Sequence, residues 1–333
     1  MKSTLPALTP ALSHREKENR ALRLGNVGQS PFSSGEQPKH DDCRTSDQIS
    51  DEPPATLPLP GERAGVRAEI NKASTNLPRI SPLLLRWFTW YSRRYIRRHF
   101  HSLRVSSLGL PPDMCGLPLV VYSNHASWWD ALVCLVLKDE FFPNRKAFTP
   151  IDAAMLGRYK FFGKLGFFGV EQRSGRGAIQ FLRTAENILR EPDSLLAITP
   201  QGRFADVRER PVRFESGLGH LATRVERAVF VPMAMELVFW EERLPEILVR
   251  FGEAIVIRPE NAGAFDAKYW TALFEQKLQA TQDALASEAK RRDPTDFQIV
   301  LRGGAGQGGI YDLWRGLKAK LRGEKFSREH GSK

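Results

Sequence analysis

The chain has 333 residues, a formal net charge of +11 at pH 7 and a mean hydropathy of −0.36. This length suits one or two domains, and the positive charge indicates an anionic partner, which leaves nucleic acid, anionic lipid and acidic substrates open. The three cysteines have no metal or redox spacing, which argues against a cysteine-based metal site or disulfide scaffold and fits a reducing, cytosolic compartment.

Residues 1–76 differ in composition from the rest of the chain. They are rich in proline, serine and charged residues and have little apolar periodicity, so they cannot bury enough surface to offset chain entropy. No apolar stretch follows Lys2, which argues against a signal peptide. Two interpretations stay open: a disordered extension, or a mis-assigned start whose true position lies downstream. The roughly 250 residues from about 78 onward suit one globular domain.

Residues 78–104 contain seven arginines and no acidic residue. Apolar side chains recur there near helical spacing, and arginines fill much of the remaining surface. An amphipathic helix of this kind suits the plane of an anionic membrane surface; the alternative is an ordinary helix that packs on its own domain. The apolar positions are Leu84, Trp87, Phe88, Tyr91, Tyr95 and Phe100. No run in the chain reaches the roughly 18–20 apolar residues of a spanning helix, so we expect a peripheral protein on the cytoplasmic face of the cell membrane.

The segment 105–300 alternates strand and helix signals. Residues 118–123 read as an apolar strand, followed by a turn and an apolar helix over 128–138. The alternation predicts an α/β domain with a largely parallel or mixed sheet flanked by helices. Further strands are expected near 146–150, 166–170, 194–199, 229–237 and 247–257, and further helices near 152–158, 176–190, 216–226 and 270–290.

Residues 301–333 begin with a glycine run at 303–309. Such a run can build a phosphate-binding loop, but this one lacks the Lys-Ser/Thr ending of those loops. We therefore expect a flexible Gly-rich linker, followed by a basic tail whose surface helix is marked by Trp314, Leu317 and Leu321.

His125 lies in the predicted turn after strand 118–123, and Asp130 follows five residues later. On a regular helix this spacing separates two side chains by about 140°, so the pair meets only if His125 lies in the turn and Asp130 in the first turns of the helix. Asp130 can then hold one imidazole nitrogen and leave the other free as a base. The alternative is a buried histidine whose hydrogen bond to a carboxylate only supports the fold.

Four blocks around this pair occur in an order that resembles the glycerolipid acyltransferase family, of the 1-acylglycerol-3-phosphate acyltransferase type. Asn124-His125-x4-Asp130 is similar to the first block of that family, and the later blocks strengthen the resemblance by their order and spacing. The resemblance covers about residues 110–260. The later blocks are Phe167-Phe168-Gly169-Val170-Glu171-Gln172-Arg173, Thr199-Pro200-Gln201-Gly202-Arg203-Phe204 and Val229-Phe230-Val231-Pro232-Met233.

The resemblance implies a single acyltransferase domain that moves an acyl chain from acyl-CoA or acyl carrier protein to a lipid hydroxyl, as in phospholipid biosynthesis. It implies that His125 is the general base and that Asp130 orients it. It implies no metal and no prosthetic cofactor, because the thioester donor is already activated. The residues that it implies in substrate binding are Asn124, Arg173, Pro200, Gln201, Gly202 and Arg203.

The third block departs from the family pattern Phe-Pro-Glu-Gly-Thr-Arg. Gln201 replaces the glutamate, and Arg203-Phe204 replaces Thr-Arg, so one carboxylate is lost and the arginine moves one position earlier. We therefore expect an acceptor other than lysophosphatidate: another lysophospholipid, a glycolipid or a different lipid alcohol.

Three other functions are alternatives to acyl transfer. A serine hydrolase lacks support because the chain has no Gly-x-Ser-x-Gly nucleophile elbow. A non-catalytic lipid-binding protein on an acyltransferase scaffold is the main alternative, because Gln201 departs from the family pattern. Nucleic-acid binding rests on net charge alone, and no nucleic-acid motif occurs, so we do not expect nucleic acid as a partner.

Overall fold

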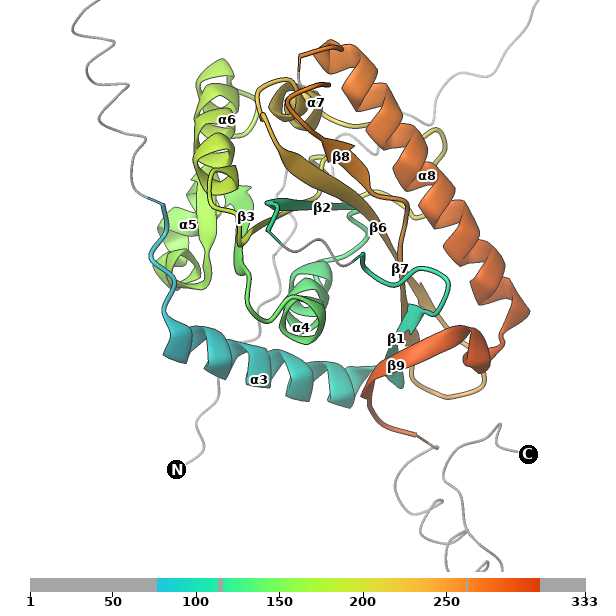
Figure 1. Cartoon of the computed structure of the whole chain (residues 1–333). Coiled ribbons are helices and arrows are strands. Elements are labelled where there is room, and N and C mark those ends of the chain that lie inside the picture. The colour runs from blue at the N-terminus through green and yellow to red at the C-terminus, as the bar shows by residue number, and fades with distance from the viewer. Residues whose placement is uncertain (1–76, 113–115, 262, 306–333) are drawn as a thin grey trace, which may run out of the picture. The chain divides into compact units, whose positions relative to one another are not determined.

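The computed structural model describes residues 77–112, 116–261 and 263–305. These residues form a mixed α/β unit in which a nine-stranded sheet has helices on both faces (Figure 1). The predicted fold class is confirmed. The expected N-terminal extension (residues 1–76) and the expected basic tail (residues 306–333) lie outside the described residues.

Strands and helices alternate along most of the described chain, as the sequence predicts. The elements are α3 (Pro82–His99), β1 (Ser102–Ser106), β2 (Leu119–Ser123), α4 (Asp130–Phe141), β3 (Lys146–Asp152), α5 (Ala153–Arg158), the 3-10 helix η1 (Lys160–Leu165), β4 (Phe167–Val170), α6 (Gly175–Leu189), β5 (Ser194–Ile198), α7 (Gly217–Ala222), β6 (Ala228–Val238), β7 (Glu246–Phe251), β8 (Ile255–Ile257), α8 (Ala267–Arg291), the 3-10 helix η2 (Pro294–Asp296) and β9 (Phe297–Arg302).

The sheet has the strand order β4-β3-β5-β2-β6-β7-β1-β9, and β8 pairs with β6 beside this path. The strands from β4 to β6 pair in parallel, as do β7 and β1, whereas β6 runs antiparallel to β7 and β8 and β1 runs antiparallel to β9. Within the parallel part, β2 lies between β5 and β6. Loops that follow parallel strands gather at their carboxyl edge, where ligand sites of α/β proteins form, so the segment after β2 is placed for function.

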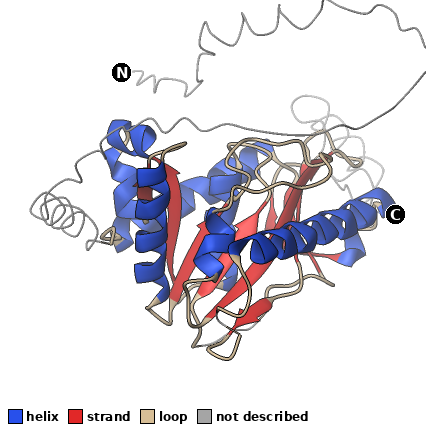
Figure 2. Ribbon diagram, turned by 90° about the horizontal axis from the view of Figure 1, so that it is seen from above, coloured by secondary structure: helices blue, strands red, loops and turns tan. Residues whose placement is uncertain are grey.

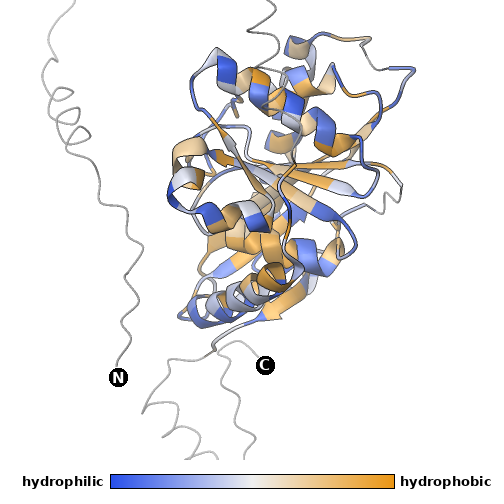
Figure 3. Ribbon diagram, turned by 90° about the vertical axis from the view of Figure 1, so that its left-hand side faces the viewer, coloured by the Kyte–Doolittle hydropathy of each residue, from blue (hydrophilic) through white to orange (hydrophobic). Residues whose placement is uncertain are grey.

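Side chains of the central strands alternate between two hydrophobic layers. Val120 and Tyr122 of β2 pack with α6, α7 and α8, whereas Leu119 and Val121 pack with α3 and α4. Figure 2 shows the helices on the two sides of the sheet, and Figure 3 shows hydrophobic residues concentrated in the strands. Burial on both faces explains why these strands are continuous apolar runs in the sequence.

The structure corrects two of the expected element boundaries. The N-terminal helix ends at His99 instead of continuing to 104, because Phe100 has extended backbone angles and the next residues form β1. The strand expected over 247–257 is divided into β7 and β8, which pair with different parts of β6. A Cβ atom on Gly252, between them, would lie 2.1 Å from the Thr281 hydroxyl oxygen, so the backbone there passes close to α8.

Helix α3 begins at a favourable sequence signal, since the Ser81 hydroxyl accepts a hydrogen bond from the helix and Pro82 occupies its first turn. It packs on α4, where Arg93 forms ion pairs with Asp139 and Glu140, so one of its arginines has acidic partners from another element. Among the described residues, no helix has the length and apolar character needed to cross a bilayer.

Candidate active site

His125 and Asp130 meet in the turn that connects β2 with α4. The strand ends at Ser123, and Asp130 is the first residue of the helix, as the spacing argument requires. His125 Nδ1 lies 2.8 Å from Asp130 Oδ2, which also accepts a hydrogen bond from the Ser127 backbone N–H at 3.1 Å. The Asp130 carboxylate is buried, so two donors and the helix N-terminus replace the water that it loses.

The free side of the imidazole faces outward. Because the carboxylate accepts a hydrogen bond from Nδ1–H, the neutral ring carries its lone pair on Nε2. The His125 side chain is 27% exposed, and no described residue forms a hydrogen bond with Nε2. This is the arrangement of a general base that can reach a proton on a bound molecule.

Asn124 anchors the turn to the neighbouring strand. Its side-chain N–H donates to the Met235 carbonyl at 3.0 Å, and its side-chain oxygen accepts from the Met235 N–H at 2.9 Å. Asn124 is buried, and both ends of its amide are used by the β6 backbone. Asn124 therefore positions His125 by joining the turn to β6, and both of its amide groups are used in these two hydrogen bonds.

The Pro200-Gln201-Gly202 turn holds the backbone of His125 from the other side. Gln201 Oε1 accepts a hydrogen bond from the His125 N–H at 2.9 Å, and the Ala205 N–H donates to the His125 carbonyl at 2.9 Å. Gly202 has φ +64°, a left-handed conformation that favours glycine. The segment thus fixes both backbone groups of the histidine, although it lies 76 residues away in the sequence.

Phe204 lies against the imidazole, a contact that the sequence did not single out. Its ring centroid is 4.3 Å from that of His125, at an interplanar angle of 39°, and the side chain is 59% exposed. Arg203, by contrast, forms an ion pair with Glu209 and donates to the Phe204 carbonyl. The turn therefore places the Phe204 ring beside the imidazole, and its Arg203 is paired with Glu209.

Arg173 stands apart from these residues. It is exposed, has φ +57°, and lies between β4 and the N-terminus of α6. No hydrogen bond or ion pair joins it to His125 or to the Gln201 turn, and β4 is three strands from β2, about 14 Å at the usual strand spacing. The structure brings His125, Asp130, Gln201 and Phe204 together, and it leaves Arg173 at the same edge of the sheet but further out.

The fold and the site define an α/β domain with a partly exposed histidine that is hydrogen-bonded to a buried carboxylate. Residues 97–236 match the protein-family model described as Acyltransferase, and this segment includes β1, most of β6, the histidine turn and the Gln201 turn. Over these residues the chain is similar to the acyltransferase family, as the resemblance predicts. No curated protein matches the chain significantly. In the described residues, no cluster of histidine, cysteine or acidic side chains is arranged to hold a metal ion.

Proposed function

We propose that this protein transfers an acyl chain from a thioester donor, acyl-CoA or acyl carrier protein, to the hydroxyl group of a lysophospholipid-like or other lipid acceptor. The Nε2 atom of His125 takes the proton of the hydroxyl, and the oxygen attacks the thioester carbonyl carbon. The carbon–sulfur bond then breaks, and the departing thiolate receives the proton from the imidazolium. Asp130 keeps the ring in the required tautomer and stabilises its charged form. The 2.8 Å contact between Nδ1 and Asp130, with Nε2 left open, carries this proposal.

The surroundings of His125 support an acceptor whose reacting end is apolar. The cation of Arg203 is engaged by Glu209, and the Phe204 ring occupies the space beside the imidazole. An apolar ring next to the base favours a lipid alcohol over a phosphate monoester at that position. For a phosphate further along the same acceptor, Arg173 is the candidate partner from the family blocks, because Arg203 is already paired with Glu209.

A membrane surface is the proposed place of the reaction. On α3, Trp87 and Trp90 are 56% and 58% exposed, among arginines that attract anionic headgroups. Ring contacts continue from this helix to the catalytic turn, since Tyr91 lies 5.7 Å from Tyr95, and Tyr95 lies 5.1 Å from Trp129. A helix seated in the cytoplasmic surface of the cell membrane would therefore bring lipid acceptors close to His125.

The proposal is tested with purified full-length protein, labelled acyl-CoA, labelled acyl carrier protein, and a panel of lysolipids and lipid alcohols in mixed vesicles. We expect a labelled acyl ester from the wild type and a loss of at least a hundredfold with His125→Ala. The control variant is His220→Ala, because His220 lies exposed on α7, away from the catalytic turn. Equal product from the wild type and His125→Ala, or lipid binding without any product, would favour the non-catalytic alternative.

A further inference from the structure

The segment that carries Phe204 continues without helix or strand through residues 203–214, the Phe204 loop. Its first part touches the catalytic turn, since the Phe204 ring lies 4.3 Å from the His125 imidazole and the Ala205 N–H donates to the His125 carbonyl. Backbone N–H and C=O groups that leave water need partners elsewhere in the protein. The partners of this loop therefore decide where Phe204 lies.

Two side chains of α8 accept hydrogen bonds from the backbone of the Phe204 loop. Gln279 Oε1 accepts from the Val212 N–H at 3.1 Å, and Glu275 Oε1 accepts from the Phe214 N–H at 2.7 Å. Val212 is 2% exposed, so little water is available to replace the glutamine oxygen. Because an unpaired N–H at a buried position is costly, these two contacts constrain the path of the loop.

Further contacts follow about two turns along the same face of α8. The Gln282 side-chain N–H donates to the Val207 carbonyl at 3.3 Å, and Asp283 Oδ1 accepts two hydrogen bonds from Arg210, at 2.6 and 3.0 Å. The contacts with α8 thus extend along most of the loop, from Val207 to Phe214. One face of a helix supplies polar partners to a segment that has no helix or strand of its own.

Helix α8 is itself fixed to the strand that ends at the histidine turn. Phe274 and Leu278, which precede the two acceptors in the sequence, are buried in the same hydrophobic cluster as Tyr122 of β2. The Phe274 ring lies 5.3 Å from that of Tyr122, and Figure 1 shows α8 along the side of β6 and β7. Strand β2 therefore positions His125 through the chain and Phe204 through α8.

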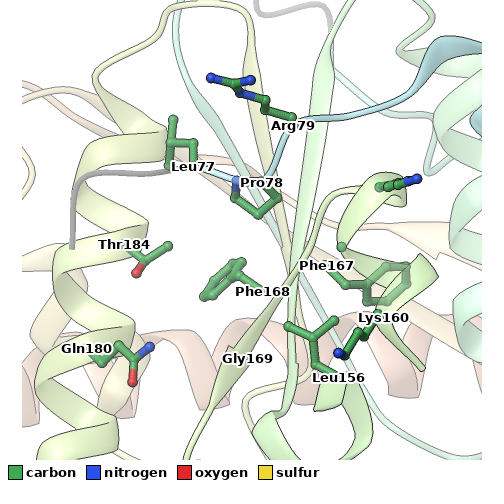
Figure 4. A pocket seen from close by; sticks show the side chains of 12 residues that line it. Leu77, Pro78, Arg79, Leu156, Lys160, Phe167, Phe168, Gly169, Gln180 and Thr184 are labelled. Atoms are coloured by element: carbon green, nitrogen blue, oxygen red, sulfur yellow. The ribbon is translucent and has the colours of Figure 1, made fainter. Parts of the chain in front are cut away.

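The contacts of α8 are separate from a hollow of about 430 Å³ at the β4 edge of the sheet. Figure 4 shows Gln180 and Thr184 of α6 on one side of this hollow and Leu156 and Lys160 on the other. None of the residues that line it belongs to α8 or to the Phe204 loop. A substitution on the loop-facing side of α8 therefore acts on the surroundings of His125 and leaves this hollow unchanged.

We propose that the face of α8 that carries Glu275 and Gln279 positions the Phe204 loop and thereby sets the preference of the site for an apolar acceptor. The inference rests on the proposed acyl transfer and names residues that select its acceptor. Both are positioning residues, because they act through Phe204. This ring is 59% exposed, so its place beside the imidazole depends on the loop. His125 keeps its hydrogen bond to Asp130 when the loop is released, so acceptor binding weakens while proton transfer is retained.

Proton NMR of the full chain with labelled histidine tests the positioning without any reaction. The Phe204 ring current shifts the imidazole proton signals of His125, which His125→Ala assigns. We expect Gln279→Ala to move these signals toward their positions in Phe204→Ala. Gln279→Glu should leave them in place, because a carboxylate oxygen still accepts from the Val212 N–H. The matched control, Gln276→Ala, removes the same side chain from an exposed position on α8 and should also leave them in place.

Steady-state kinetics then connects the loop with acceptor choice. Gln279→Ala should raise the KM for a lipid alcohol about fivefold, while kcat and the KM for the acyl donor stay unchanged. Gln279→Glu should restore the wild-type KM. The double variant Phe204→Ala/Gln279→Ala should have the KM of Phe204→Ala alone, because both substitutions remove the same contact. A helix that only stabilised the fold would give additive losses instead.

Thermal unfolding of each variant shows whether it folds. Should Gln279→Ala fail to fold, Glu275→Ala removes the neighbouring contact with Phe214 and gives the same two readings, with Glu275→Gln as its rescue. The absence of product from every donor and acceptor would refute the proposed function, and the His125 signals would still decide the role of α8. Unmoved His125 signals in Gln279→Ala, an equal change in Gln276→Ala, or additive KM effects in the double variant would each overturn the inference.

Discussion

The replacement Asp130→Asn changes one atom of the site and tests the role of the carboxylate. In the structure, Asp130 Oδ2 accepts from His125 Nδ1–H and from the Ser127 N–H. An asparagine keeps the shape but removes the charge. If its oxygen takes the Oδ2 position, it accepts from both groups but no longer stabilises the imidazolium; if its NH2 group takes that position, Ser127 loses its acceptor and Nδ1 must accept, so that the ring carries its proton on Nε2. In either orientation the variant folds with a weaker base at Nε2.

The expected loss follows from what a positioned base contributes. General base catalysis accounts for about 10²–10⁴ in rate, and Asp130→Asn should lower kcat within that range while the KM for either substrate changes little. Initial rates of acyl ester formation give the comparison, and thermal unfolding of both proteins shows that folding is retained. A folded variant with more than about a third of the wild-type kcat would refute this role of the carboxylate. A loss of about 1.4 kcal/mol of stabilisation of the charged or correctly protonated ring would already lower kcat about tenfold.

The remaining predictions concern Gln201, Phe204, the two exposed tryptophans of α3 and the buried Glu246. Gln201→Ala should lower kcat about tenfold, because the backbone N–H of His125 loses its acceptor at a cost of about 1–3 kcal/mol. Gln201→Glu should keep kcat within a few-fold of the wild type, because the glutamate still offers this N–H an oxygen acceptor. Phe204→Ala should raise the KM for apolar acceptors by about tenfold and leave the KM for the donor unchanged in steady-state assays. Trp87→Ala and Trp90→Ala should each weaken co-sedimentation with anionic vesicles by about tenfold while activity on a water-soluble acceptor is retained. Glu246→Ala should lower the free energy of unfolding in urea by about 3–5 kcal/mol, because it leaves the buried Arg104 without its ion-pair partner. An unchanged urea midpoint of unfolding would contradict this prediction.

The sequence predicts those parts of the fold that depend on local pattern. The strand before His125, the helix after it and α6 carry uninterrupted or periodic apolar positions, and each lies within two residues of its expected start. Strands β1 and β9 are not predicted from local apolar pattern. In β1, Arg104 is buried and forms a hydrogen bond and ion pair with Glu246, 142 residues further on. A buried arginine reads as a surface residue until its distant partner is known.

The same distinction applies to the site. His125 and Asp130 are five residues apart, so local geometry is enough to predict their contact. The hydrogen bond from His125 to Gln201 and the ring contact of His125 with Phe204 join segments far apart in the sequence, and only the packing of β2 beside β5 creates them. The family blocks locate the Gln201 turn near the histidine, but they do not indicate that its side chain fixes a backbone N–H.

In the proposed reaction, the departures in the third block concern the acceptor and leave the base intact. An amide oxygen accepts the same hydrogen bond from the His125 N–H as a carboxylate would, so Gln201 keeps the histidine in place while it removes a negative charge. Next to it, Glu209 neutralises Arg203 and the Phe204 ring covers the space beside the imidazole. The turn thus supplies an oxygen acceptor for the His125 N–H, and its arginine is paired with Glu209. In the proposed reaction, Gln201 supports proton transfer through the His125 N–H and Phe204 faces the acceptor, which is why single substitutions in this turn should change one without the other.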